Sequence, residues 1–383
     1  MCSLLLVSGC ATRQSELVPL PSADLYRDQG FKPASEPVTA AGLFTLTEPM
    51  KAYLRSKQFR TEVLYHGPER GLVNALYKKG ELKIEYDASI TRTAAQTYEA
   101  GMGNCLSLVI MTAAFAKEMG MQVHYQNVMV EEQWSRSGNL YYASTHVNLA
   151  LGSRVRYARN EDAPNRLVID FIPSESAAAQ HTLPLEEDAI VAMYMNNRAA
   201  EAIMQNRVDD AYWWARAAIA HKSTFLTAYN TLGVVYQRHG DHAMAEKVFR
   251  RALEREPEDH IVLRNLLPAL EQLGKKAEAA DVARQLASIE PTPPFHYFHL
   301  GMKAMEQENF SEAKRLFGRE VRRAPYNHEF HFWKAIAHWR LGEARAAREE
   351  MRKAIDTSNT ADSTQKYSAK LAFLREHAPA VSN

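Results

Sequence analysis

The chain has 383 residues, of which 46% are hydrophobic and 24% charged; this composition is typical of globular proteins and excludes a collagen-like or largely disordered chain. Lys and Arg (46) nearly balance Asp and Glu (45), so the net charge of +1 provides no general basic surface for nucleic acid. This length predicts two domains, or one domain followed by an array of repeats. Three cysteines occur, Cys2, Cys10 and Cys105, and two of them lie at the start of the chain, so a disulfide-stapled body is excluded.

The first residues have the order of a secretion leader. Leu4–Val7 is apolar, and the small residues Ser8 and Gly9 precede Cys10. This order resembles the signal of bacterial lipoproteins, which implies cleavage before Cys10 and lipid attachment to it. In the lipoproteins that this leader resembles, an Asp after the cysteine favours retention in the inner membrane. Ala11 follows the cysteine here, so the resemblance implies a place in the cell envelope at the periplasmic face of the outer membrane. The alternative is an unprocessed N-terminus, since the apolar stretch is short and no Lys or Arg precedes it.

Residues 11–40 are expected to form a flexible tether, because no apolar period is sustained there and prolines would interrupt a helix. These prolines are Pro19, Pro21, Pro33 and Pro37. With residues 1–10 forming the leader and its lipid-attachment motif, two folded domains are expected to follow. The first occupies residues 41–188 and the second residues 189–378.

The C-terminal part repeats with a fixed period. Pro257, Pro291 and Pro325 are each 34 residues apart. Small and large apolar residues recur at constant offsets before them, in the first copy as Tyr229, Leu232, Gly233, Tyr236, Ala245, Phe249 and Ala252. This order resembles the tetratricopeptide repeat, in which small residues let two helices approach and large ones fill the gap between hairpins. We therefore expect an all-α solenoid of about five hairpins over residues 192–359, closed by a capping helix over Lys366–His377.

The resemblance also implies that fixed positions of each repeat line a concave groove. In the third and fourth copies these positions are aromatic or Met, which suits an apolar peptide or helix. The predicted groove residues are Phe295, Phe298, Met302, Met305, Phe332 and Trp339. Alternatively, the capping helix or the N-terminal domain fills this groove. Pro268 is expected to kink a helix of the second copy.

Cys105 follows the glycine-bearing turn Gly101–Asn104 and precedes the apolar stretch Leu106–Gly120. Because this stretch is apolar nearly all round, it predicts a buried helix that ends at its glycine. Cys105 would then lie at the helix N-terminus, where backbone N–H groups and the helix dipole favour a thiolate over a thiol.

Three strand candidates follow: Met121–Glu132, Leu140–Leu151 and Arg166–Ile172. Alternation of apolar and polar residues places His146 on the second strand, and Asp170 lies on the third. A cysteine at a helix start, followed by His and Asp on successive antiparallel strands, has the order of a nucleophile, a base and an orienting group.

This part of the chain resembles the core of the transglutaminase-like, papain-related superfamily. The motifs that carry the resemblance are Gly103–Cys105, His146–Leu149 and Val168–Pro173. The resemblance covers approximately residues 85–175 and implies an α+β domain in which a helix packs on an antiparallel sheet. It implies that Cys105 is the nucleophile, His146 the general base and acid, and Asp170 the group that orients His146.

An oxyanion donor is less clearly marked in the sequence. The backbone N–H of Cys105 is one candidate, and Gln96 or Tyr98, expected in the loop before it, are two others. Asn104 replaces the Asp that is commoner in this superfamily, and Asn148 lies where an aromatic residue is frequent.

Together these features predict an envelope-anchored, cysteine-dependent acyl-transfer enzyme that attacks an amide. Resolution by water would make it a peptidase or amidase, and resolution by an amine a transglutaminase-type transferase; the sequence leaves both open. The repeats would recruit a protein or peptide, and lipid on Cys10 would bind the membrane. No cofactor, metal or nucleic acid is expected. The alternative is a catalytically silent lipoprotein scaffold for protein–protein interaction, because a lone cysteine can be core filler.

Overall fold

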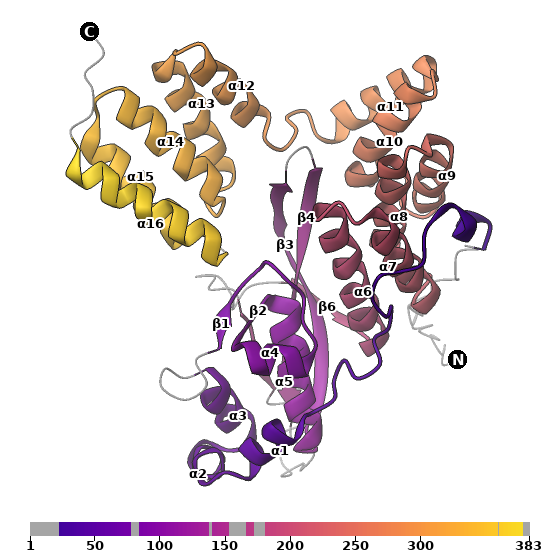
Figure 1. Cartoon of the computed structure of the whole chain (residues 1–383), viewed down its shortest axis with the longest axis vertical. Coiled ribbons are helices and arrows are strands. Elements are labelled where there is room, and N and C mark those ends of the chain that lie inside the picture. Colours follow the sequence, from indigo (N-terminus) through magenta and orange to yellow (C-terminus); the bar gives the residue numbers. More distant parts are fainter. Residues whose placement is uncertain are drawn as a thin grey trace, which may run out of the picture.

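The computed structural model describes residues 23–77, 84–137, 140–152, 166–171, 181–358 and 360–377. An α+β part with a small antiparallel sheet comes first and is followed by an array of helices (Figure 1). The predicted leader and Cys10 lie outside the described residues. Among the described helices, none is long and apolar enough to cross a bilayer.

Three short helices begin the α+β part: α1 (Glu48–Arg55), α2 (Lys57–His66) and α3 (Pro68–Tyr77). Ser56 caps α2 by accepting a hydrogen bond from the N–H of Phe59. The next helix, α4 (Ala94–Ala100), starts at a capping box formed by Thr93 and Gln96 and ends at Gly101 in the left-handed conformation (φ 65°). These helices surround the element that carries the cysteine.

That element is α5 (Cys105–Glu118), which begins after Asn104. The Asn104 side chain accepts a hydrogen bond from the N–H of Ser107 and so caps the helix. Every residue from Leu106 to Ala116 is buried, which confirms the buried helix predicted from the apolar stretch. The structure thus places Cys105 at the first helical position.

The sheet is antiparallel, with strand order β5-β4-β3-β6. Its strands are β3 (Gln122–Ser137), β4 (Leu140–Gly152), β5 (Leu167–Ile169) and β6 (His181–Leu185). α5 packs against β3 and β4, so the expected helix on an antiparallel sheet is present. A separate two-stranded parallel ladder pairs β1 (Glu85–Tyr86) with β2 (Met102–Gly103), directly before α5. Such a layered arrangement occurs in many folds and does not by itself identify a transglutaminase-like domain.

Five helical hairpins and a closing helix make up the array that follows. The helices are α6 (Glu187–Met204), α7 (Val208–His221), α8 (Leu226–His239), α9 (His242–Leu253), α10 (His260–Gln272), α11 (Lys276–Ile289), α12 (His296–Glu306), α13 (Phe310–Arg323), α14 (His328–Arg340), α15 (Ala344–Asp356) and α16 (Ala361–Glu376). This confirms the hairpins predicted from the 34-residue period. Pro268 lies inside α10, and the kink expected there stays a prediction.

Small residues of the period lie where two helices of a hairpin cross. A side chain added at Gly233 of α8 would come 2.3 Å from the ring of Phe249 on α9. In the same way, a side chain added at Gly301 of α12 would come 2.6 Å from the ring of Phe317 on α13. The glycines therefore let a buried phenylalanine lie directly against the neighbouring helix.

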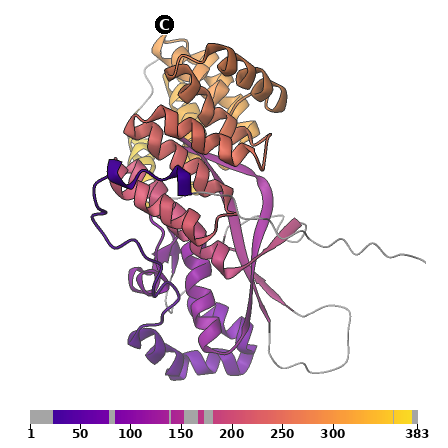
Figure 2. The ribbon, with the colours of Figure 1, turned by 90° about the vertical axis from the view of Figure 1, so that its right-hand side faces the viewer.

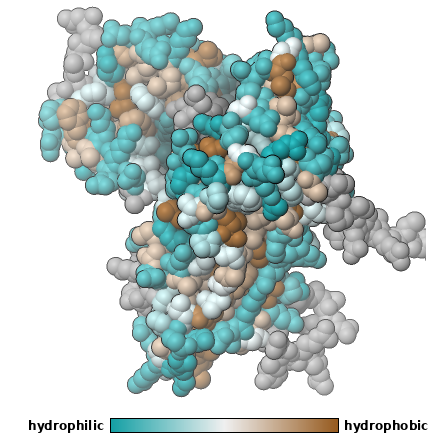
Figure 3. All heavy atoms as spheres, turned by 45° about the vertical axis from the view of Figure 1, so that its right-hand side comes forward, coloured by the Kyte–Doolittle hydropathy of each residue, from teal (hydrophilic) through white to brown (hydrophobic). Residues whose placement is uncertain are grey.

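The array is divided between α11 and α12, where Figure 1 shows two groups of helices joined by a loop. One apolar core runs from Leu25 in the N-terminal segment through α5 to Ala279 of α11. A second core begins at Phe295, and a third lies beneath α16. Hydrophilic side chains cover most of the face seen in Figure 3, with scattered hydrophobic residues that include several at the narrow middle of the molecule.

The predicted flexible tether over residues 11–40 is wrong for residues 23–40, which lie along the repeat helices (Figures 1 and 2). Phe31 stacks on Tyr212 with ring centroids 3.9 Å apart. The hydroxyl of Tyr236 donates a hydrogen bond of 2.7 Å to the carbonyl of Leu25. The segment contains two short 3-10 helices, η1 (Ala23–Leu25) and η2 (Asp28–Gly30). Prolines limit the length of a helix here, but they do not prevent an extended segment from packing on a neighbouring surface.

Gly233→Ala is expected to destabilise the array. Overpacking against Phe249 costs about 1–3 kcal/mol, which exceeds the ~1 kcal/mol that Ala gains over Gly inside a helix. A urea titration would measure the free energy of unfolding. Gly318→Ala in α13 is the matched control, because its added methyl would have no atom closer than 3.9 Å and should make the protein equally or more stable. Equal effects of the two substitutions would contradict this account of the helix crossing.

Candidate active site

The structure brings two of the three predicted catalytic residues into contact. His146 lies on β4, and Asp170 directly follows β5. Their side chains meet with 2.6 Å between His146 Nε2 and Asp170 Oδ1, and they are only 6% and 13% exposed. The antiparallel β4–β5 register pairs Leu149 with Ile169, so Asp170, the next residue, continues along β4 towards Asn148 and His146.

Asn148 contacts the same carboxylate. Its Nδ2 lies 3.4 Å from Asp170 Oδ2, and its side chain is buried. Because successive residues of a strand alternate between faces, Asn148 and His146 share one face of β4. Asn148 therefore contributes a second donor to Asp170 from the strand that carries His146.

Cys105 is half-buried and carries a free thiol beside His146. Burial lowers the pKa of His146, but the hydrogen bond to Asp170 and the contact with the Cys105 thiol outweigh it and raise this pKa to about 9. His146 Nδ1 is buried and makes no conventional hydrogen bond among the described residues. Since Nε2 is engaged by Asp170, Nδ1 is the nitrogen available to the thiol.

The side-chain amide of Asn104, the residue before Cys105, uses both its oxygen and its nitrogen in hydrogen bonds. Its Oδ1 accepts hydrogen bonds from the N–H and the hydroxyl of Ser107, at 2.9 and 2.8 Å. Its Nδ2 donates at 2.8 Å to the hydroxyl oxygen of Thr91. A carboxylate at this position would keep the acceptors and lose the donor.

The oxyanion candidates Gln96 and Tyr98 lie on α4, so their predicted placement in a loop is wrong. The side-chain oxygen Oε1 of Gln96 accepts a hydrogen bond from the backbone N–H of Thr93 in the capping box. Tyr98 packs against the rings of Tyr53 and Phe115, and burial raises its pKa. A capping-box pattern, T-x-x-Q, was the signal that could have predicted this helix start.

Sequence reasoning missed Tyr86, which lies beside the cysteine. The β1–β2 ladder pairs Tyr86 with Gly103, two residues before Cys105. Burial raises the pKa of Tyr86, and the nearby charges of Cys105 and Asp87 raise it further. A strand of two residues leaves no detectable period in the sequence, and so this neighbour could not be predicted.

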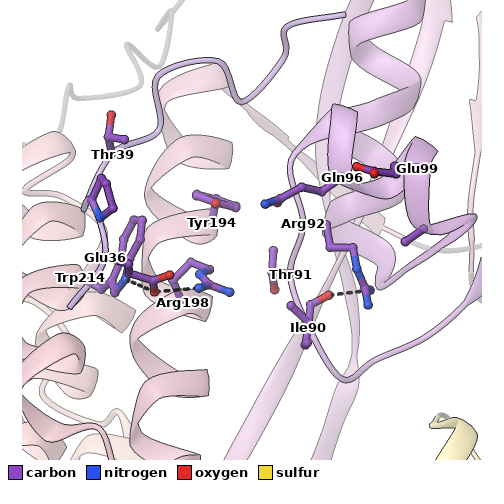
Figure 4. Close-up of a pocket in the computed structure, with 12 residues that line it drawn as sticks. Glu36, Thr39, Ile90, Thr91, Arg92, Gln96, Glu99, Tyr194, Arg198 and Trp214 are labelled. Atoms are coloured by element: carbon purple, nitrogen blue, oxygen red, sulfur yellow. Dashed lines mark hydrogen bonds and ion pairs between the residues drawn. The ribbon is translucent and has the colours of Figure 1, made fainter. Parts of the chain in front are cut away.

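A polar cavity of about 400 Å³ lies on another side of the domain, between the start of α4 and the helices α6 and α7 (Figure 4). Gln96 and Tyr194 point towards one another across it. Arg92 and Arg198 contribute positive charge to its walls, and Glu36 contributes a carboxylate that is bound to Arg198. Neither Cys105 nor its two predicted partners line this cavity.

The predicted aromatic groove of the later repeats is wrong for Phe295 and Phe298, which are enclosed. Phe295 and Phe298 are 1% and 0% exposed, inside the core formed by α12 to α14. Phe332 stacks on Tyr367 of α16, with centroids 5.0 Å apart, and Trp339 contacts another ring of that helix. Phe332 and Trp339 are half-buried, so the capping helix covers part of this face, and their place in a partner groove stays a prediction. The physical reason for the enclosure of Phe295 and Phe298 is that neighbouring helices of a solenoid also need large residues between them.

The remaining groove candidates, Met302 and Met305, are half-buried against the same core as Phe298. His331 of α14 is buried and bonds to Glu350 at 2.7 Å and to a backbone carbonyl at 3.0 Å. Within the described parts of the chain, no group of three or more His, Cys, Asp or Glu residues could hold a metal ion.

Comparison with known proteins concerns the array. Residues 230–294 and 298–362 match the family model of the tetratricopeptide repeat. The C-terminal part is therefore a tetratricopeptide-repeat solenoid. No curated protein matches the chain. The transglutaminase-like assignment and the lipoprotein leader stay predictions.

Solved structures similar to this chain include three repeat proteins. A thermophilic TPR protein of Thermus thermophilus is 13% identical and covers 49% of this chain and 100% of its own, with a TM-score of 0.31. YrrB, described as a TPR protein with an unusual peptide-binding site, is 20% identical over 46% of this chain and 92% of its own, with a TM-score of 0.26. MamA from Desulfovibrio magneticus RS-1 is 16% identical over 45% and 96%, with a TM-score of 0.26.

The contact between His146 and Asp170 should make stability depend on pH. Because the folded-state pKa of His146 is raised from 6.5 to about 9, its contribution to stability is fully present below about pH 6.5 and is lost as pH rises through about 9. Asp170→Asn removes the carboxylate that stabilises the protonated form of His146. The difference in Tm between wild type and Asp170→Asn is therefore expected to be largest near pH 6 and to shrink towards pH 10, as thermal melts across roughly this range would show. A constant difference would contradict the charged pair.

Proposed function

We propose that this protein is a cysteine-dependent acyl-transfer enzyme acting on an amide, with Cys105 as nucleophile, His146 as base and acid, and Asp170 as the group that orients His146. The observation that carries the proposal is the buried 2.6 Å contact between His146 and Asp170 beside a half-buried thiol. A desolvated His–carboxylate pair is costly to keep unless its members hold each other's charge. The same arrangement prepares an imidazole to exchange a proton with a neighbouring nucleophile.

In the proposed reaction, the Cys105 sulfur attacks the amide carbonyl carbon and forms a C–S bond. The carbonyl oxygen becomes an oxyanion, and the backbone N–H of Cys105, at the first helical position of α5, is positioned to stabilise it. When the tetrahedral species collapses, the C–N bond breaks and the leaving amine takes the proton held by His146. A thioester of Cys105 results.

The thioester is then resolved by a second nucleophile, whose proton passes to His146 as its oxygen or nitrogen bonds to the acyl carbon. The C–S bond breaks and the Cys105 sulfur is released. Water as the nucleophile makes the protein a peptidase or amidase, and an amine makes it a transglutaminase-type transferase. Hydrolysis is the version we adopt, because bacterial relatives of the superfamily that this domain resembles are more often considered proteolytic.

The repeats are proposed to recruit a protein or peptide substrate, since such solenoids provide extended binding surfaces. The inner face of α8 and α10 offers polar groups for this purpose. Asn230 accepts a hydrogen bond of 2.9 Å from Asn265, and Gln237 donates one of 2.6 Å to the Asn265 carbonyl. Lipid on Cys10 is proposed to hold the protein at the periplasmic face of the outer membrane; the leader order is the support for this part.

A catalytically silent scaffold is the second candidate. It is favoured by the geometry of His146 Nδ1, which makes no conventional hydrogen bond to the thiol or to any other described group. Against it stands the exposure of Cys105, which is half-buried rather than enclosed as core filler would be. Reactivity of the thiol separates the two candidates.

Iodoacetamide should alkylate Cys105 faster in the folded protein than in urea. An imidazole that takes up the thiol proton makes more of the sulfur reactive than the few per cent available to an unassisted thiol at pH 7, so we expect a rate severalfold higher than in urea. Mass spectrometry of the peptide that contains Cys105 would give the rate without interference from the other cysteines. His146→Ala should return the rate to that of the unfolded chain.

His124→Ala is the matched control for that substitution. His124 lies on β3, opposite Ala150 of β4, and its loss removes an imidazole from the same sheet without touching Asp170. It should leave alkylation of Cys105 unchanged. If the wild type reacts no faster than the unfolded chain, or if His146→Ala changes nothing, the catalytic proposal is wrong and the scaffold is favoured.

A further inference from the structure

A chain of buried hydrogen bonds joins the first repeat helix to the start of the cysteine helix. From α6, Glu201 Oε1 accepts a hydrogen bond of 2.6 Å from the N–H of Thr91. Asn197, also on α6, donates at 3.1 Å to the hydroxyl oxygen of Thr91. Asn104 donates to the same oxygen at 2.8 Å, and the next residue is Cys105.

Three of these groups are buried. Thr91, Asn104 and Glu201 are 2%, 9% and 6% exposed. An unsatisfied donor or acceptor at such depth costs about 1–3 kcal/mol, so each group is held to its partner. Because Asn104 is bonded to Ser107 through its oxygen and to Thr91 through its nitrogen, its side chain has one orientation.

Further hydrogen bonds hold the α6 residues of this contact in place. Arg198 of α6 donates to Glu201 at 2.9 Å and to Glu36 of the N-terminal segment at 2.8 Å. Figure 4 shows Arg198 and Glu36 on one side of the polar cavity and Thr91, on the loop before α4, facing them. The segment 23–40, α6 and the Thr91 loop thus form one bonded unit that ends at the cap of α5.

We propose that Thr91, Asn197 and Glu201 are positioning residues for Cys105, so that the first repeat helix sets the orientation of the thiol. This inference rests on the proposed acyl-transfer function and extends it. The array is then part of the reactive centre in addition to being a recruitment module. The residues act through Asn104, which caps α5 and carries the Cys105 backbone N–H with it.

The test measures alkylation of Cys105 by iodoacetamide, across a range of pH, in the full chain. Thr91→Val keeps the shape of the side chain and removes the oxygen that binds Asn104 and Asn197. It is expected to slow alkylation severalfold and to change its pH profile, because small displacements of a reactive group are costly. Thr91→Ser restores the oxygen and should restore both the rate and the profile.

Thr231→Val is the matched control, since its buried hydroxyl donates at 3.1 Å to the Thr227 carbonyl inside α8 and has no contact with the Thr91 loop. Its alkylation should equal that of wild type. Asn197→Ala removes one of the two hydrogen bonds between α6 and Thr91 and leaves the bond between Asn104 and Thr91, so it supplies the test if Thr91→Val does not fold. Thermal melts would show which variants are folded.

The outcomes separate this inference from the function on which it rests. Fast alkylation in the wild type, slow alkylation in Thr91→Val and Asn197→Ala, and rescue by Thr91→Ser would support it. Fast alkylation in the wild type and in both variants would overturn the positioning role and leave the proposed function intact. Slow alkylation in the wild type, equal to that of the unfolded chain, would overturn both.

Discussion

The arrangement around Cys105 depends on the complete burial of α5. Its residues from Leu106 to Ala116 are apolar or internally bonded and none faces water, so other elements must cover the helix on every side. The sheet covers one side, α3 and α4 cover others, and α6 of the array closes the enclosure. Only the two ends of this helix are not buried: Cys105 at its start is half-buried, and Lys117 and Glu118 at its end are exposed.

Enclosure also explains the electrostatics of the site. Burial by itself would keep His146 neutral, because a charged imidazole loses its hydration. The carboxylate of Asp170, 2.6 Å from His146 Nε2, favours the charged imidazole instead, and the neighbouring thiol of Cys105 also raises the pKa of His146. Exclusion of water thus strengthens the contact between His146 and Asp170, which favours a protonated imidazole beside Cys105. The same low-dielectric surroundings make the bonds of Thr91 and Asn104 an effective link between the array and the thiol.

The array shows how one periodic sequence serves two purposes. Glycines at the crossing points, such as Gly233, admit a neighbouring phenylalanine and so set the hairpin geometry. Large residues at other positions pack against the closing helix, since Phe332 and Trp339 are half-buried in ring contacts with α16. The surface proposed for a partner is the polar face that α8 and α10 form with Asn230 and Asn265. The segment 23–40 lies along the repeat helices and ties them to the N-terminal domain through Glu36.

The sequence by itself determined the features that depend on local periodicity and on single residues at fixed positions. These are the hairpins of the 34-residue repeat, the buried helix after Cys105, and His146 and Asp170 on or beside successive strands. Only the tertiary structure decided that Gln96 and Tyr98 lie on a helix, that Phe295 and Phe298 are enclosed, and that residues 23–40 are docked. The bond between Thr91 and Glu201 joins residues 110 positions apart, and no local pattern marks it. Local patterns report which face of an element is apolar, whereas the partner of that face is chosen by the packing of the whole chain.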